Sequence, residues 1–597
     1  MQHPITILEK YWNFTEFKPL QEDIINSVLD GDDTFALLPT GGGKSLCFQI
    51  PALAQEGICI VISPLIALMK DQVQNLQELG IKAMALTSGI SQDELGTLLD
   101  NCVFGNYKFL YLSPERLQQE MVQLRIREMN VNLIAVDEAH CISQWGNDFR
   151  PAYKNIAFLR QLQPAVNMIA LTASATPKVV EDIIKELDFI KPNVFKQSFA
   201  RPNIAYLVLH EEDKYYRVES ILKKYTGSSI IYVRNRKLTV EISQFLESKN
   251  ITATYYHGGL STNEKNAHMH QWLHNQKQVM IATNAFGMGI DKPNVRFVVH
   301  YDLPKNIEGY YQETGRAGRD GLASEALLLF GMQDVATAKH FVENVTDEEQ
   351  RRLENFKLSS MVDFAEAQTC RRNVLLNYFS EPSHKPCGNC DICLDPPTLF
   401  DGKEAAQKAL SCIYRLEQSF GAKQVIDVLR GMDNERIRNL NHNQLSTYGV
   451  GKEYSAQEWS SILRQLIHLG YIYQDIQNYS VLKLTALSGD VLKGKTEIQL
   501  AFPKKSASKV TRPGKKSSSK ETLLDKDRDC FEELRALRKE IAESEDKPAY
   551  QIFGDATLVE MAQKRPTTDN ELLAISGVGE KKLENYGFEF LAALRAM

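Results

Sequence analysis

The sequence lacks several features that would assign it to particular classes of protein. None of its apolar runs approaches the ~18–20 residues of a membrane span, so no membrane-embedded segment is expected. The N-terminus begins Met1–Pro4 and has no basic region followed by an apolar core, which argues against a secretory signal. No internal repeat of solenoid period is present. The missing membrane span and secretory signal predict a cytoplasmic protein.

A strong charge of one sign is also missing. The chain holds 69 Lys and Arg against 75 Asp and Glu, for a formal net charge of −6. This balance gives no global footprint for nucleic acid, although a single groove can be basic when the total is not. Hydrophobic content of 43% and charged content of 24% are typical of a soluble globular protein. Length predicts roughly three to five domains at about 150 residues each.

Residues 40–45 form a glycine-rich segment typical of a phosphate-binding loop. It follows a strand candidate at 34–38 and precedes a helical apolar pattern that begins at Leu46. Backbone N–H groups of such a turn surround phosphate oxygens, a lysine adds charge, and a hydroxyl can hold Mg²⁺. Leu38 replaces the first glycine of the strict pattern, so the strand–turn–helix context carries the prediction. The residues expected to bind ATP here are Thr40, Gly41, Gly42, Gly43, Lys44 and Ser45.

Two carboxylates follow the apolar run 133–136, which predicts a buried strand. At the end of that strand, Asp137 would hold Mg²⁺ and Glu138 would act on the attacking water. A lone Asp-Glu pair is usually a solvated surface pair, but not at the end of a buried strand. Together with the phosphate loop, the pair predicts an ATPase.

Short apolar strands alternate with helical patterns in two successive parts of the chain, which predicts two α/β domains with parallel sheets and helices on both faces. Only the first has a phosphate loop. Further on, 346–403 is helical and rich in cysteine, 404–502 is mixed with a hairpin near 471–485, and 504–520 is rich in Ser and Lys without an acidic residue, as in flexible linkers. The apolar periodicity of residues 527–597 predicts helices that form a small all-α domain. The strand candidates are 58–62, 106–112 and 168–172 in the first part, and 229–233, 253–256, 278–283 and 297–301 in the second.

Arg316 and Arg319 lie near the end of the second α/β part, with small residues between them. The spacing of three predicts that both guanidinium groups lie on one face of a helix. An arginine that reaches the γ-phosphate across a closing cleft would make hydrolysis depend on domain closure. The alternative is a pair of arginines on a helix surface.

Four of the ten cysteines are clustered. Four thiolates in a short span suit tetrahedral Zn²⁺. The C-x-x-C-x-x-C spacing would also suit an iron–sulfur cluster, and the spacing alone leaves both open. The clustered residues are Cys370, Cys387, Cys390 and Cys393, whereas the scattered cysteines are expected to be small buried hydrophobes.

The order of these motifs, over essentially the whole chain, resembles RecQ-type DNA helicases of superfamily 2, in particular their bacterial forms. The run D-E-A-H-C-I-S-Q-W-G-N-D-F-R-P at 137–151 is specific to that family; the other matching segments are 17–21, 39–45, 63–72, 113–117, 285–293 and 312–321. The resemblance implies two RecA-like domains at 1–205 and 206–345 and a zinc module at 346–403. A winged helix at 404–502, a basic linker at 503–526 and an HRDC domain at 527–597 would follow.

The resemblance also implies roles for single residues. Lys18 and Gln21 would contact adenine, with Phe14 or Phe17 supporting the ring, and Gln312 would act with both arginines. Lys18 stands where the family usually has Arg and so lacks a planar stacking surface. In the third helicase motif, Ser174 stands where the family usually has Thr. For the four cysteines, the resemblance favours a structural Zn²⁺.

Contacts with DNA are expected at two places. Trp145 and Phe149, with Arg150, lie just past Glu138 and could stack on single-stranded bases at ~1–3 kcal/mol per base. The alternative for large aromatics is the core. Tyr479, at the expected hairpin tip, could wedge the duplex apart, and an exposed turn tyrosine is the alternative.

The expected activity is ATP- and Mg²⁺-dependent 3′-to-5′ unwinding in recombination, repair and replication-fork processing. The resemblance implies single-stranded and duplex or forked DNA as partners, then a single-stranded-DNA-binding protein and a topoisomerase, and a location at the nucleoid. The HRDC domain would bind DNA or a protein. An RNA helicase and an ATP-driven translocase without strand separation stay open as alternatives.

Overall fold

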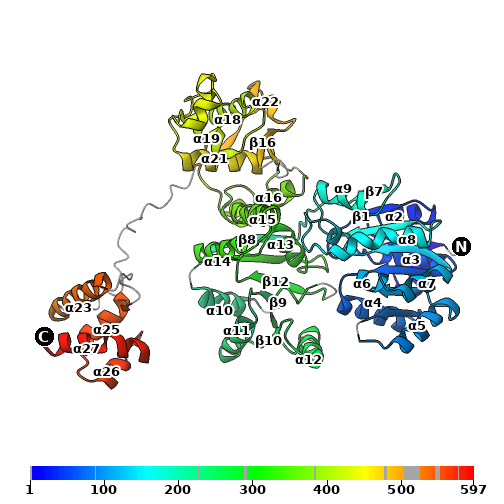
Figure 1. Ribbon diagram of the computed structural model, residues 1–597, viewed down its shortest axis with the longest axis horizontal. Helices are drawn as coiled ribbons and strands as arrows, with labels where there is room; N and C mark the ends of the chain where they lie inside the picture. Colours follow the sequence, from blue (N-terminus) through cyan, green and yellow to red (C-terminus); the bar gives the residue numbers. More distant parts are fainter. Residues whose placement is uncertain are drawn as a thin grey trace. The chain divides into compact units, whose positions relative to one another are not determined.

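The computed structural model contains two compact units, residues 1–503 and 504–597 (Figure 1). The structure describes residues 3–87, 89–211, 213–225, 227–287, 292–381, 383, 385–475, 480–502, 525–544, 552–575 and 577–596. Most of the expected linker and the hairpin-tip Tyr479 therefore lie outside the described residues. Among the described helices, none combines the length and apolar character needed to cross a membrane.

The first α/β domain is built on a seven-stranded parallel sheet of order β3-β4-β2-β5-β6-β1-β7. Both faces are buried, because alternate residues of a strand enter different cores: Phe35 and Leu37 one, Ala36 the other. Helices α2, α3 and α4 pack on one face, and α5, α7 and α9 on the other. The strands are β1 (Thr34–Leu37), β2 (Ile58–Ile62), β3 (Ala83–Leu86), β4 (Phe109–Leu112), β5 (Val131–Val136), β6 (Met168–Thr172) and β7 (Asn193–Lys196); the helices are α1 (Pro4–Trp12), α2 (Gln21–Leu29), α3 (Leu46–Ala54), α4 (Ile66–Glu78), α5 (Gln92–Phe104), α6 (Pro114–Leu117), α7 (Glu120–Glu128), α8 (Leu159–Leu162) and α9 (Pro177–Glu186), with 3₁₀ turns η1 (Ala139–Ile142) and η2 (Pro151–Phe158).

The second α/β domain has a six-stranded parallel sheet of order β10-β11-β9-β12-β13-β8. Its edge strand β8 begins at Ile204, eight residues after β7 ends, so the hinge between the sheets is short. The strands are β8 (Ile204–His210), β9 (Ser228–Tyr232), β10 (Ala253–Tyr256), β11 (Val279–Ala282), β12 (Val295–His300) and β13 (Ser324–Phe330); the helices are α10 (Lys214–Lys224), α11 (Arg236–Ser248), α12 (Thr262–Leu273), α13 (Ile307–Thr314) and α14 (Met332–Glu343).

The predicted α/β class and the parallel sheets are confirmed, with two differences in detail. The strand expected at 106–112 begins only at Phe109, because Asn106 has a φ of 53° and breaks the extended backbone. Four strands of these sheets were not expected from the sequence: β3 and β7 in the first sheet, and β8 and β13 in the second. Strands β8 and β13 pair with each other over seven residues and complete the second sheet.

The remainder of the first unit is helical with two small antiparallel ribbons. Helix α15 packs its apolar side into the core shared with both α/β domains, whereas residues from 405 onward form a separate core. Arg464 of α21 donates to Asp363 and Glu366 of α15 at 3.2 and 2.9 Å and joins the two parts. The elements are α15 (Glu348–Glu366), α16 (Arg371–Tyr378), α17 (Asp391–Leu394), α18 (Lys403–Arg415), α19 (Ala422–Arg430), α20 (Glu435–Asn439), η3 (His442–Gln444), α21 (Ala456–His468) and α22 (Ser488–Leu492), with ribbons of β14 (Leu399–Asp401) with β17 (Gln499–Ala501) and β15 (Ile472–Asp475) with β16 (Val481–Leu484).

The second unit is helical over its described residues, as expected from its apolar periodicity. Its core gathers Phe531, Phe553 and Phe590 from successive segments. The helices are α23 (Asp525–Ser544), α25 (Asp555–Lys564), α26 (Asp569–Leu573) and α27 (Glu580–Ala596).

Candidate active site and metal centre

A cavity of about 450 Å³ lies between the two α/β domains and collects the predicted nucleotide-binding residues. Its walls come mainly from the segment between α1 and α2, the loop after β1, the end of β5, and α13 with the segment that follows it. Of the fourteen residues predicted to bind or hydrolyse ATP, all but Gly42 line it: Phe14, Lys18, Gln21, Thr40, Gly41, Gly43, Lys44, Ser45, Asp137, Glu138, Gln312, Arg316 and Arg319. Residues far apart in the sequence thus meet around one space of suitable size for a ligand.

The glycines of the phosphate loop are required by its backbone and by its neighbours. Gly41 and Gly43 have φ of +84° and +75°, and a Cβ on Gly43 would lie 2.3 Å from Nε2 of Gln21. Gln21 donates to the Gly43 carbonyl at 3.0 Å, and the Lys18 ammonium donates to the Gly41 carbonyl at 2.9 Å. Lys18 and Gln21 therefore lie directly against the loop.

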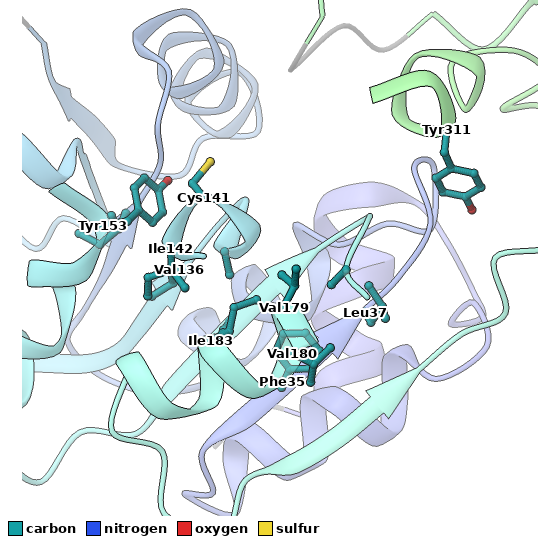
Figure 2. Packing of buried hydrophobic residues seen from close by; sticks show 14 of the residues in the cluster. Phe35, Leu37, Val136, Cys141, Ile142, Tyr153, Val179, Val180, Ile183 and Tyr311 are labelled. Carbon is teal, nitrogen blue, oxygen red and sulfur yellow. The ribbon is translucent and has the colours of Figure 1, made fainter. Parts of the chain in front are cut away.

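The paired carboxylates are held at the end of β5 by apolar packing. Figure 2 shows Ile142 of η1 beside Val136, the last residue of that strand. Glu138 stands between strand and turn with a φ of 47°, a conformation uncommon outside glycine. Its N–H donates to Oδ1 of Asp137 at 2.9 Å, and the Tyr153 hydroxyl donates to the Asp137 carbonyl at 3.1 Å.

Burial shapes the acidity of this pair. Desolvation raises the pKa of Asp137 to about 7, and the neighbouring Glu138 charge adds to the effect, while Lys44 opposes it. Desolvation also raises the pKa of Glu138, against the charges of Lys44 and Arg316. A buried carboxylate pair beside a lysine and a serine fits a divalent cation, which would offset the cost of ionising both groups. Ser45 and Asp137 could hold Mg²⁺.

His140 is a further neighbour of Glu138 with no role assigned from the sequence. Its Nδ1 lies 3.3 Å from Glu138 Oε2 and 2.9 Å from the Thr172 hydroxyl. Burial lowers the pKa of His140 to about 4, so the imidazole is neutral. It connects Glu138 with the third helicase motif at the end of β6.

Arg316 and Arg319 do not share a helix face, and the prediction of a helix there is wrong. Helix α13 ends at Thr314, and the segment continues as turns, with Gly318 at a φ of +57°. The turn still delivers both arginines to the cavity. Arg319 Cγ would lie 3.5 Å from a Cβ on Gly41, and Arg316 is buried with no hydrogen-bond partner for Nε among the described residues. An unpaired buried guanidinium N–H beside the phosphate loop fits an anionic group.

The four clustered cysteines form one site. Their sulfur atoms all lie within 4.8 Å of one another, and those of Cys387 and Cys393 are 3.8 Å apart. Tetrahedral Zn²⁺ with Zn–S of about 2.3 Å places its sulfurs about 3.8 Å apart, so the donor set fits zinc. Arg371 clamps the site by a bidentate contact with Asp391, at 3.0 and 2.9 Å.

The residues predicted to bind DNA are only partly exposed, and some already contact other protein groups. Trp145 is half-buried and packs against the core, so it is neither fully exposed nor a core residue. Arg150 donates to Asp148 and to the Pro64 carbonyl, and so already has protein partners. Phe149 is half-buried, with the Lys154 ammonium 5.8 Å from its ring centre. Tyr479 lies outside the described residues.

Five family models match successive parts of the chain between residues 18 and 594. The matching models are the DEAD/DEAH box helicase at 18–183, the helicase conserved C-terminal domain at 213–321, the RecQ zinc-binding model at 332–394, the RQC domain at 396–509 and the HRDC domain at 527–594. These matches include strands β1–β6 and β9–β12, the cysteine site and most of the helical second unit.

Curated relatives agree with these models. Proteins called "ATP-dependent DNA helicase RecQ" match from Pasteurella multocida, with 44% identity over all of this chain and 94% of the relative, and from Haemophilus influenzae, with 44% identity over 99% of this chain and 95% of the relative. The protein of that name from Bacillus subtilis is 40% identical over 99% of this chain and 98% of its own length. With a two-domain nucleotide cavity, a four-cysteine site and near-complete coverage of these relatives, the chain belongs to the RecQ family of ATP-dependent DNA helicases.

Proposed function

We propose that this helicase moves along single-stranded DNA in the 3′-to-5′ direction and unwinds duplexes in recombination, repair and replication-fork processing. The observation that carries the motor part of the proposal is the cavity lined by both α/β domains. A site completed by Arg316 and Arg319 from the second domain hydrolyses ATP only when the domains close, which turns hydrolysis into movement. The polarity and the pathways rest on family membership.

We assign the residues of the cavity the following roles. Lys44 and the N–H groups of the loop bind the phosphates, Ser45 and Asp137 hold Mg²⁺, and Glu138 orients and deprotonates water. Arg319 and Arg316 stabilise charge that develops on the γ-phosphate, with Gln312 beside them. Phe14, Lys18 and Gln21 bind the base. Mg²⁺, when bound, neutralises charge on the phosphates.

DNA would be bound by the segment that holds Trp145, Phe149 and Arg150, and Tyr479 would separate the strands. The domain limits predicted from the sequence serve as the working division of the chain. A single-stranded-DNA-binding protein and a topoisomerase as partners, and a cytoplasmic location at the nucleoid, are proposals from the family alone.

ATP-dependent strand displacement on a 3′-tailed DNA duplex tests the function, with a 5′-tailed DNA duplex and a tailed RNA duplex in parallel. Displacement of the 3′-tailed DNA alone is expected. Lys44→Ala should abolish hydrolysis and displacement while leaving DNA binding intact. DNA-stimulated hydrolysis without displacement of any duplex would instead favour a translocase, and displacement of the RNA duplex would favour the RNA alternative.

A further inference from the structure

Arg201, in the hinge between the two sheets, binds both halves of the nucleotide site without lining the cavity. Its Nη1 donates to the Thr40 carbonyl of the phosphate loop at 3.0 Å. The same guanidinium donates to three carbonyls of the arginine-bearing turn: Gly315 at 3.4 Å, Ala317 at 3.2 Å and Gly318 at 3.3 Å. One planar, permanently charged group thus joins two segments that belong to different domains.

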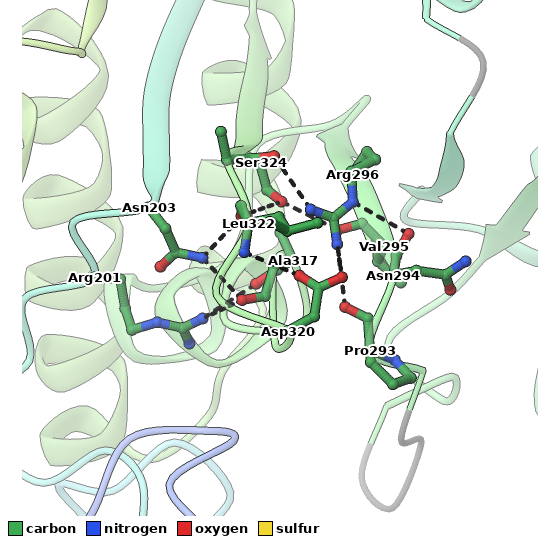
Figure 3. Close-up of polar contacts among 12 residues, drawn as sticks. Arg201, Asn203, Pro293, Asn294, Val295, Arg296, Ala317, Asp320, Leu322 and Ser324 are labelled. Atoms are coloured by element: carbon green, nitrogen blue, oxygen red, sulfur yellow. Dashed lines mark hydrogen bonds and ion pairs between the residues drawn. The ribbon is translucent and has the colours of Figure 1, made fainter.

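The arginine-bearing turn is held closely against the phosphate loop at this point. A Cβ on Gly315 would lie 3.1 Å from Cβ of Thr40, so the Gly315 backbone lies directly against the Thr40 side chain. Asn203 donates to the Gly318 carbonyl at 2.8 Å and to the Leu322 carbonyl at 3.1 Å. Figure 3 shows Arg201 and Asn203 approaching the turn from one side and Arg296, paired with Asp320, from another.

The hinge is itself held by the cysteine-rich module. Asn389, between Cys387 and Cys390, donates to the Pro202 carbonyl at 3.1 Å. Arg372 donates to the Ile204 carbonyl at 2.9 Å and to Oδ1 of Asn389 at 2.9 Å. The backbone of Pro202, next to Arg201, is therefore held by a residue of the cysteine-rich module, which restricts the position of the Arg201 guanidinium.

We propose that Arg201 is a positioning residue for ATP hydrolysis, which seats the turn that carries Arg316 and Arg319 on the phosphate loop. It does not line the cavity and acts through Thr40 and the turn. The proposal rests on the function assigned above to the cavity. Because the interaction uses four carbonyl acceptors at once, a lysine, with a single ammonium, cannot replace it.

The test compares wild type with Arg201→Lys in single-stranded-DNA-stimulated ATP hydrolysis. Since a shift of about 1 Å in catalytic groups costs about 10²-fold in rate, kcat should fall by about that factor. KM for ATP should change by less than ~3-fold, because the binding contacts of the phosphate loop stay in place. Affinity for single-stranded DNA, zinc content and Tm should match wild type.

Arg160→Lys is the matched control. Arg160 also donates to a backbone carbonyl and a carboxylate, Leu187 at 2.9 Å and Asp33 at 2.7 Å, but does not line the cavity. The Arg160→Lys variant should retain the wild-type kcat. Unchanged kcat in Arg201→Lys, an equal loss in the control, or a fall in kcat matched by loss of ATP binding or of Tm would overturn the proposal. Absence of stimulated hydrolysis in the wild type would instead refute the proposed function.

Discussion

The side-chain amide of Asn147 donates a hydrogen bond to Oε1 of Gln312, 3.2 Å away. Asn147 belongs to the segment that carries Trp145, whereas Gln312 lines the nucleotide cavity. The neighbouring Gly146 carbonyl accepts from the buried Lys357 ammonium of α15 at 2.6 Å. A displacement of this segment by DNA would therefore disturb its hydrogen bonds with Gln312 and with Lys357 of α15.

Replacing Trp145 with Ala should uncouple DNA binding from ATP hydrolysis. Loss of stacking should weaken single-stranded DNA binding by about 1–3 kcal/mol, and stimulation of hydrolysis should be lost while basal hydrolysis is kept. Titration of ATPase rate against DNA concentration measures both. Trp145→Phe keeps an aromatic face and should retain most of the stimulation. If Trp145→Ala is stimulated as wild type is, Trp145 serves the core alone.

Glu138→Gln should separate nucleotide binding from hydrolysis. The amide keeps the size of the side chain but cannot take a proton, so kcat should fall by about 10²–10⁴-fold, whereas affinity for a labelled ATP analogue should be kept. Glu128→Gln, at a surface pair with Arg125, is the control and should behave as wild type. Hydrolysis by Glu138→Gln at the wild-type rate would remove Glu138 from its proposed role.

The raised pKa of Asp137 predicts a specific pH dependence. With a pKa of about 7 before nucleotide binds, Asp137 is largely protonated at pH 6 and cannot hold Mg²⁺. The value of kcat/KM for ATP should therefore rise between about pH 6 and 8 and then level off, since kcat/KM reports the free enzyme. A profile that is flat over this range would contradict the assignment.

The raised pKa of Asp137 affects folding stability in the opposite direction: activity should rise with pH, whereas stability should fall. The folded-state pKa lies above the usual 3.8, so the folded protein binds more protons than the unfolded chain between about pH 4 and 7. Stability of the nucleotide-free protein should thus decrease through that window as pH rises. Asp137→Asn should lessen the decrease in a denaturant titration series.

Metal analysis should find one zinc per chain and no iron. Cys390→Ser should lose the metal and lower Tm, because Cys390 is fully buried in the site. Cys102→Ser, a buried cysteine of the first α/β domain, should retain zinc. A coloured, iron-containing protein would mean that the site holds an iron–sulfur cluster.

Much of this protein can be derived from local sequence. The phosphate loop, the carboxylates after β5 and the cysteine spacing are short motifs whose backbone context is set by neighbouring residues, and the structure brings them together as predicted. Strand β8 is apolar except for His210 but was not predicted, because the run lies at the boundary expected between the two α/β domains and joins the sheet only by pairing with the distant β13. The arginine turn was misjudged, since spacing alone does not reveal that Gly318 adopts a positive φ.

The sequence by itself determined the α/β class, the parallel sheets, the candidate zinc ligands and thirteen of the nineteen residues that line the cavity, because each depends on periodicity or on contiguous motifs. Only the tertiary structure decided that Arg201, 161 residues from Thr40, joins the two halves of the site. It also decided that Lys357 supports the segment around Trp145, across 211 residues. Such contacts join side chains to backbone carbonyls. Because every residue carries a carbonyl, the residue type of the acceptor does not predict these contacts from the sequence.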